Sequence, residues 1–187
     1  MKKFVFSVFF CMSIPNLFAD GISTPTPISF QKPETVKQQV ADDFILYAEI
    51  EQEVRDGKLI KKHKTEESDR FPLEWTLYLD HSEKVREYIE EGGSEDNAET
   101  VKYYYDESGR LRVVANDYGD VYGTDDEQII LLDLRGQILQ VNVEENFVNK
   151  EMGRNEHQKK VLKEPVDFNS TKVEFVHDPL KRFKKQK

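Results

Sequence analysis

Histidine is the side chain most often found as a metal ligand, and this chain has four of them. No two stand at the spacing of a metal-binding motif, and a His-Glu-x-x-His segment is absent from the sequence. They are His63, His81, His157 and His177. The sequence therefore predicts no histidine metal site, and these residues read as ordinary strand, turn and surface histidines.

Acidic residues gather in two short segments, 116–120 and 125–127, which raise the question of a calcium site. Calcium needs six to eight oxygen ligands from a compact loop, and the spacing here does not match the EF-hand pattern. We expect solvent-exposed acidic turns in both segments, and calcium binding by them stays an open alternative.

Nucleophilic catalysis finds little support in this sequence. Serines are few and lie in expected loops, and the strand–turn–helix motif Gly-x-Ser-x-Gly is missing. The single cysteine, Cys11, lies inside an apolar N-terminal run. A pair of carboxylates for sugar hydrolysis remains open because their separation in space is unreadable from sequence. We predict that the protein is not an enzyme and that it uses no cofactor and no metal.

Aromatic and basic residues on neighbouring expected strands make the sharpest candidate for binding. One face of the sheet would carry Trp75, Tyr103 and Tyr105 and form core. The opposite face would combine tyrosines with cations, the composition of a recognition surface. Its predicted binding residues are Tyr78, Arg86, Tyr88, Lys102, Tyr104 and Arg112. The alternative is ordinary cross-strand pairing on a solvated sheet.

A recurring turn motif positions these residues. The motif begins with Asp and continues with any two residues, usually Gly, a long polar residue and an aliphatic residue. Copies begin at Asp106 and Asp133, and a degraded copy begins at Asp80. Aspartate at the first position can accept hydrogen bonds from backbone N–H groups further along the turn, and glycine at the fourth supplies a left-handed conformation. Glu83 replaces that glycine at a cost of about 1 kcal/mol, so its hairpin is expected to be the least rigid.

Three further segments complete the expected elements. Pro33 begins a short helix, the alternating residues 44–50 form a strand, and Asp56 with Gly57 makes a two-residue hairpin turn. Residues 82–91 could be a helix, but their match to the other hairpin copies favours a strand.

The expected fold is mainly β: an antiparallel up-and-down meander of about seven to nine strands. It forms a curled sheet or a barrel, with a short N-terminal helix. Residues 118–123 read as a longer glycine loop, and 146–163 as a helix packed at one end or a mobile segment. Residues 34–178 form a single domain.

The N-terminus reads as a secretory signal peptide. Residues 1–19 combine a lysine-rich start, an apolar run from Phe4 to Ile14 and a small residue, Ala19. We predict cleavage after Ala19 and a periplasmic or secreted location in a bacterium. Residues 20–33 form a flexible leader, and residues 179–187 a basic tail.

Charge limits the partners. The chain carries a formal net charge of −9, which disfavours nucleic acid and anionic membranes. No segment after the signal peptide is expected to insert stably into a membrane. The oligomeric state cannot be read from the sequence.

Residues 103–112, Tyr-Tyr-Tyr-Asp-Glu-Ser-Gly-Arg-Leu-Arg, resemble the Tyr-Asp hairpin repeats of large bacterial surface and toxin shells. They are also similar to hairpins of small secreted bacterial β-meander proteins of unassigned function. The likeness spans residues 75–145 in three units. It implies a hairpin chain and transfers no functional residue, since the shells need many more units.

Three functions follow from these observations. The first is a secreted or periplasmic protein that recognises another protein, such as an inhibitor or immunity protein. The second is an envelope factor that carries a lipid or another apolar ligand, and the third is a hydrolase with an acidic pair.

Overall fold

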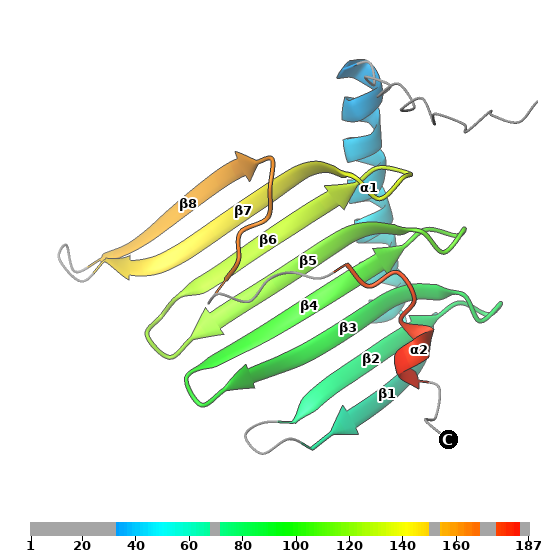
Figure 1. Cartoon of the computed structure of the whole chain (residues 1–187), viewed down its shortest axis with the longest axis horizontal. Coiled ribbons are helices and arrows are strands. Elements are labelled where there is room, and N and C mark those ends of the chain that lie inside the picture. Colours follow the sequence, from blue (N-terminus) through cyan, green and yellow to red (C-terminus); the bar gives the residue numbers. More distant parts are fainter. Residues whose placement is uncertain (1–32, 68–71, 150–153, 169–174, 184–187) are drawn as a thin grey trace, which may run out of the picture. The chain divides into compact units, whose positions relative to one another are not determined.

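The computed structural model describes residues 33–67, 72–149, 154–168 and 175–183. Eight antiparallel strands form one sheet in the order of the sequence, β1 to β8 (Figure 1). Their bounds are Ile60–Glu66, Leu73–Leu79, Val85–Ser94, Asn97–Tyr105, Leu111–Asp120, Asp125–Leu132, Ile138–Asn149 and Arg154–Leu162. The predicted up-and-down meander is confirmed. The sheet is open, with β1 and β8 at its edges, so the barrel alternative is wrong.

The repeated turns form as the sequence predicts. In each copy the first aspartate accepts hydrogen bonds at Oδ1 from the backbone N–H groups two and four residues on, at 2.7–3.0 Å. Gly109 and Gly136 have φ of 77°. Glu83 also takes the left-handed conformation, with φ of 61°, as expected from its place in the turn.

A further turn of this kind was missed at Asp120. Asp120 Oδ1 accepts from Tyr122 N at 2.8 Å and Thr124 N at 3.0 Å, and Gly123 is left-handed. The expectation of a longer loop at 118–123 is therefore wrong, because β5 continues to Asp120. The Asp-x-x-Gly signal was present in the sequence, but no long polar residue and aliphatic residue follow it.

Residues 82–91 are not helical, and strand β3 begins at Val85. The strand prediction is confirmed. The strand register shifts next to each of the three matching turns. On the strand that enters the turn, the shift falls between Tyr78 and Leu79, Tyr104 and Tyr105, or Leu131 and Leu132. The extra residue of each β-bulge is Arg86, Arg112 or Leu139, so the repeat preserves the bulges as well as the turns.

The N-terminal helix is much longer than expected. Helix α1 spans Pro33–Arg55, so the predicted strand at 44–50 is wrong. Residues 44–47 are apolar on both strand parities, and no glycine or proline occurs between Glu34 and Asp56. Val40, Tyr47, Ile50 and Val54 recur at helical spacing and pack on the sheet.

The expected hairpin at Asp56 and Gly57 is also wrong, because these residues end the helix. Gly57 N donates to Val54 O at 3.1 Å, and Lys58 N donates to Glu53 O at 2.9 Å. With Gly57 at φ of 66°, these bonds satisfy carbonyls of the last helical turn. The Asp-Gly pair therefore marks the C-terminus of a helix. Glycine is common at that position, as it is in hairpin turns.

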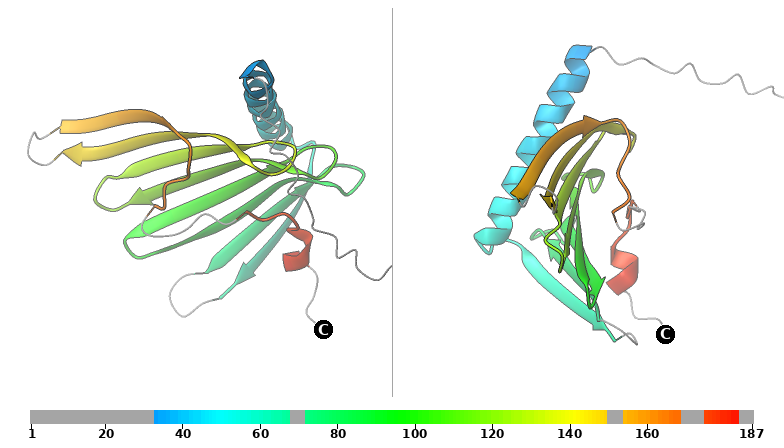
Figure 2. Two further views of the ribbon diagram at one scale, coloured as in Figure 1. Left: turned by 45° about the horizontal axis from the view of Figure 1, so that its top comes forward. Right: turned by 90° about the vertical axis from the view of Figure 1, so that its left-hand side faces the viewer.

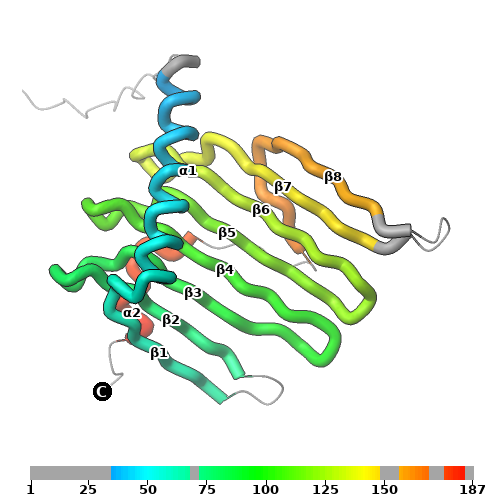
Figure 3. The backbone as a smooth tube through the Cα atoms, turned by 180° about the vertical axis from the view of Figure 1, so that it is seen from behind, coloured from blue at the N-terminus to red at the C-terminus, as the bar shows by residue number. Residues whose placement is uncertain are grey.

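The two faces of the sheet are covered by different parts of the chain. Helix α1 crosses one face, and the C-terminal segment with helix α2, Leu180–Phe183, covers the other (Figures 2 and 3). On the α2 face, Phe168 packs into the main core with Trp75, Tyr88 and Tyr103. The smaller core beneath α1 is built around Ile50 and Tyr104.

Strand β8 was not predicted, because its charged sequence lacks an apolar alternation. It pairs with β7 along its whole length, and the chain then crosses to the α2 face. Gln128 fixes this crossing: its Nε2 donates to Val166 O at 2.6 Å, and its Oε1 accepts from Val166 N at 3.0 Å.

Candidate functional site

Five of the six predicted binding residues lie on the α1 face of the sheet. Tyr88 does not: it lies opposite Leu77 and Tyr103 in the main core, so its predicted face is wrong. The β-bulge is the cause, since it places the extra residue Arg86 between Val85 and Glu87 and breaks the simple alternation along β3.

Most of these residues are also buried rather than solvated. Arg86, Tyr104 and Arg112 lie beneath α1, and Tyr88 lies under the C-terminal segment. Tyr78 and Lys102 are only partly exposed. The expected tyrosine surface is therefore a helix–sheet interface. The prediction missed this because the expected N-terminal helix was too short to cover the sheet.

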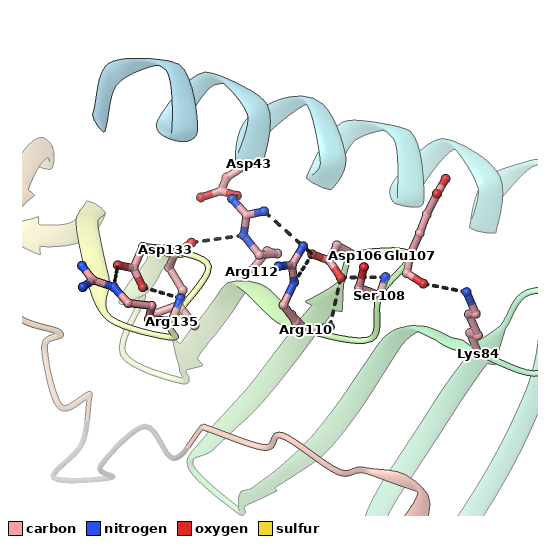
Figure 4. Close-up of polar contacts among 10 residues, drawn as sticks. Asp43, Lys84, Asp106, Glu107, Ser108, Arg110, Arg112, Asp133 and Arg135 are labelled. Carbon is pink, nitrogen blue, oxygen red and sulfur yellow. Dashed lines mark hydrogen bonds and ion pairs between the residues drawn. The ribbon is translucent and has the colours of Figure 1, made fainter. Parts of the chain in front are cut away.

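Arg112 is the centre of the first polar cluster in this interface (Figure 4). Its Nη2 lies 2.5 Å from Asp43 Oδ1 on α1, and its Nε donates to Leu132 O at 3.2 Å. Asp106 Oδ2 lies 3.9 Å from Arg112 Nη1 and 2.7 Å from Arg110 Nη2. Burial raises the pKa of Asp43 to about 7, although the Arg112 charge lowers it. This cluster ties the helix to the turn at Asp106.

A second cluster joins the C-terminal part of α1 to β4. Glu51 Oε1 accepts from Tyr104 Oη at 2.6 Å and from Lys102 Nζ at 3.2 Å. Glu87, opposite Tyr104 on β3, is buried, and this burial raises its pKa to about 7. The two clusters position the helix, and their geometry gives the predicted residues a structural role.

A groove beside the N-terminal half of α1 is the more accessible candidate. It has a volume of about 340 Å³ and lies over β6, β7 and β8. The side chains of Phe44 and Val161 line it, and these residues are 36% and 68% exposed. Ile45, next to Phe44, is 56% exposed. Such exposed apolar side chains together mark an interaction surface more often than isolated ones do.

Charged residues form the rim of this groove. Glu127, Glu144 and Lys159 follow one another on adjacent strands, and Lys159 Nζ lies 2.6 Å from Glu144 Oε2. Burial, followed by the charges of Asp117 and Glu144, raises the pKa of Glu127. Sequence reasoning missed the groove because Phe44 was assigned to a strand and Val161 to a segment expected to be a helix or mobile.

A second pocket, of about 410 Å³, lies near the other end of α1. Its lining is strongly charged and includes Arg86, one of the predicted binding residues. The remaining lining residues are Glu53, Lys58, Leu59, Asp80, His81, Lys84 and Glu107.

Within the described part of the chain, no three His, Cys, Asp or Glu side chains are grouped so that they could hold a metal ion. The carboxylate of Asp120, in the segment tested for calcium, caps its own turn. The helices among the described residues include none that is both long and apolar enough to cross a membrane.

Comparisons with known proteins add no relative. No family model, no curated protein and no solved structure matches this chain. The resemblance to Tyr-Asp hairpin repeats therefore stays a prediction.

Proposed function

We propose that the protein is a secreted or periplasmic bacterial binding protein that recognises another protein. The observation that carries this proposal is the groove lined by Phe44 and Val161, with Ile45 beside it. Apolar centres with charged rims are the usual anatomy of protein interfaces. An inhibitor or immunity protein is the form of this function that we favour.

Charge indicates the kind of partner. The chain has a net charge of −9, and Glu127 and Glu144 lie in the groove wall. Complementary charge increases association rates and disfavours wrong partners, so a partner with a basic surface fits best. Within the groove Glu144 and Lys159 pair with each other, and Lys160 pairs with Glu145, so the preference for a basic partner rests on Glu127 and on the net charge of the whole chain.

Photo-crosslinking in the producing cells tests the proposal. A photoreactive amino acid at position 161 should capture one defined protein, whereas the same residue at position 121 should not. Val121 is a matched control because it is 65% exposed and lies in the turn between β5 and β6.

The captured protein then allows a binding measurement. Val161→Lys should weaken its affinity about thirtyfold, the effect of losing roughly 2 kcal/mol at an interface centre. Val121→Lys should leave the affinity unchanged. Equal capture at both positions, or equal affinity of both variants, would contradict the proposal. A retained lipid in native mass spectrometry would instead favour the apolar-ligand alternative.

A further inference from the structure

Arg86 and Arg112 occupy equivalent positions in two copies of the hairpin. Each follows its aspartate by six residues, and each is the extra residue of a β-bulge beneath α1. Both side chains are about nine-tenths buried, with exposed fractions of 8% and 10%. Their guanidinium groups therefore have the same need for partners, since a buried charge is costly when it is left without them.

Arg112 has two close acceptors. Asp43 Oδ1 lies 2.5 Å from its Nη2 and Leu132 O accepts from its Nε at 3.2 Å, while Asp106 Oδ2 is 3.9 Å from its Nη1. Arg86 has one ion pair within 4.0 Å among the residues that the structure describes, with its Nε 3.7 Å from Glu53 Oε2, and the charge of Asp80 interacts with it from further away. That distance is too long for a hydrogen bond. The guanidinium of Arg86 therefore forms no hydrogen bond of ordinary length to a described residue, and its five N–H donors are available to the pocket that it lines.

The difference arises from the path of α1 and from the first turn. Asp80 matches Asp106 in the repeat, and both use Oδ1 to cap their own turns, but only the Oδ2 of Asp106 is paired with the arginine of its turn, Arg110, in the described structure. Arg112 Nη1 lies 3.9 Å from the matching Asp106, whereas Asp80 forms no comparable ion pair with Arg86 in the described structure. Glu53, near the end of α1, is 37% exposed and does not close over Arg86.

Arg86 faces the 410 Å³ pocket, and other cations line it as well. Lys84 and Lys58 contribute ammonium groups, and His81 contributes an imidazole. Lys84 Nζ already donates to Glu107 O at 2.8 Å, and Lys58 Nζ lies 2.7 Å from Asp56 Oδ2, so both are held in place by one contact. A planar guanidinium flanked by fixed ammonium groups is the geometry that recognises an oxyanion.

We propose that this pocket binds a carboxylate group, with Arg86 as its bidentate donor and Lys84 as its second cation. The carboxylate oxygens would accept hydrogen bonds from the Arg86 guanidinium, in the role that Asp43 Oδ1 and Leu132 O have at Arg112. A singly charged carboxylate fits better than a phosphate dianion, because Glu53, Asp80 and Glu107 also line the pocket and repel added negative charge. The site is separate from the groove at Phe44, so either proposal can fail without the other.

Nitrogen-15 NMR of the full mature chain tests the site directly. Acetate is titrated at constant ionic strength against sodium chloride, and the Nε–Hε signal of Arg86 and the amide signals of His81 and Lys84 are followed. These signals should shift and saturate, while the signals of Arg110 and Arg135 in the later turns should not. A parallel titration with inorganic phosphate should give weaker binding than acetate.

Variants separate the pocket from general charge effects. Arg86→Gln should weaken acetate binding at least tenfold, the expected loss of a charge-assisted bidentate contact. Lys84→Gln should weaken it about threefold to tenfold on the same scale. Arg110→Gln is the matched control, because Arg110 holds the position of Lys84 in the next repeat and lies outside the pocket lining; it should change nothing.

Three results would overturn the inference. They are an Arg86 signal that does not saturate with acetate, equal shifts at Arg110 and Arg135, and tighter binding of phosphate than of acetate. If Arg86→Gln fails to fold, the wild-type titration and Lys84→Gln still decide the question.

Discussion

Single residues of the hairpin repeat have diverged while their backbone positions stayed the same. Arg86, Arg112 and Leu139 are the extra residues of three successive β-bulges, and all three face α1. Arg112 has two close acceptors, Arg86 has one carboxylate at 3.7 Å, and Leu139 packs in the smaller core. The repeat thus fixes where a side chain points, and the helix above it decides what that side chain can do.

Glu87 gives the α1 interface a pH dependence. Its pKa is raised from 4.5 to about 7 by burial, with the Glu51 charge as the next cause. A carboxyl with a raised pKa favours folding when it is protonated, so its contribution is fully present below pH 4.5 and is lost as the pH rises through 7. Asp43, with a pKa of about 7, acts in the same direction.

We therefore expect urea unfolding at pH 5 to give a larger unfolding free energy than unfolding at pH 8. Glu87→Gln should reduce this difference by roughly 1–3 kcal/mol, since each pKa unit corresponds to about 1.4 kcal/mol. Glu91→Gln, at an exposed position of the same strand, serves as the control and should keep the wild-type difference. An unchanged pH dependence in Glu87→Gln would show that the carboxyl does not titrate in the interface.

At the scale of elements, helix α1 is the part of the fold that holds the interface together. It contacts β4, β5, β6 and β7, and Ile50 lies fully buried at its centre. Ile45, five residues earlier in the same helix, is 56% exposed. These two isoleucines differ in environment alone, which makes them a matched pair.

Ile50→Ala should lower the unfolding free energy by about 2–5 kcal/mol, because a buried side chain is lost and a cavity is left. Ile45→Ala should change it by less than about 0.5 kcal/mol, as is usual for exposed positions. Chemical denaturation of both variants measures the difference. Similar losses in the two variants would mean that α1 does not pack on the sheet through Ile50.

The elements that the sequence predicted were those with local signals. Asp106 and Gly109 determine their turn by hydrogen bonding and left-handed φ, so the hairpin and its repeat could be read directly. Phe44 to Ile50 alternates like a strand and also repeats like a helix, and local pattern could not decide between the two. Tyr88 was misplaced because a one-residue bulge reverses the face of every later residue. Strand β8 is highly charged and forms because it pairs with β7. This pairing leaves no apolar alternation in the sequence of β8 from which a strand could be predicted.

The site was harder to predict than the fold for the same reason. Arg86 and Tyr104 were found as candidates, but their burial depends on where α1 crosses the sheet. The groove at Val161 requires α1 and β8 together, and neither was recognised at full length. Sequence therefore identified several residues of the interface without showing that a helix covers them.

At the scale of the whole described molecule, the C-terminal segment closes the face of the sheet that α1 leaves uncovered. Tyr105 Oη donates to Val176 O, and Phe183 packs edge-on against Tyr88 with ring centroids 6.4 Å apart. The beginning of the predicted basic tail belongs to this layer, because Arg182 Nη2 lies 3.2 Å from Glu90 Oε1. These contacts give the tail a structural role in addition to its charge.

Trp75, the only tryptophan, reports on this closure. Its ring centroid is 5.1 Å from Lys64 Nζ and 5.6 Å from Arg182 Cζ, and the residue is 6% exposed. Cation–π contacts of this kind are worth about 0.5–2 kcal/mol. Deleting residues 179–187 removes Arg182 and Phe183 together, so we expect acrylamide quenching of Trp75 fluorescence to increase at least about twofold, as the local closed state loses stability.

Two single variants distinguish packing from charge in that experiment. Arg182→Ala should increase quenching part of the way, whereas Lys181→Ala should not, because the Lys181 side chain is 75% exposed and pairs only locally with Asp178. Quenching that is unchanged by the deletion would show that the sheet holds Trp75 without the C-terminal segment. Quenching that rises equally in both single variants would point to the net charge of the tail rather than to the stacking of Arg182 on the ring.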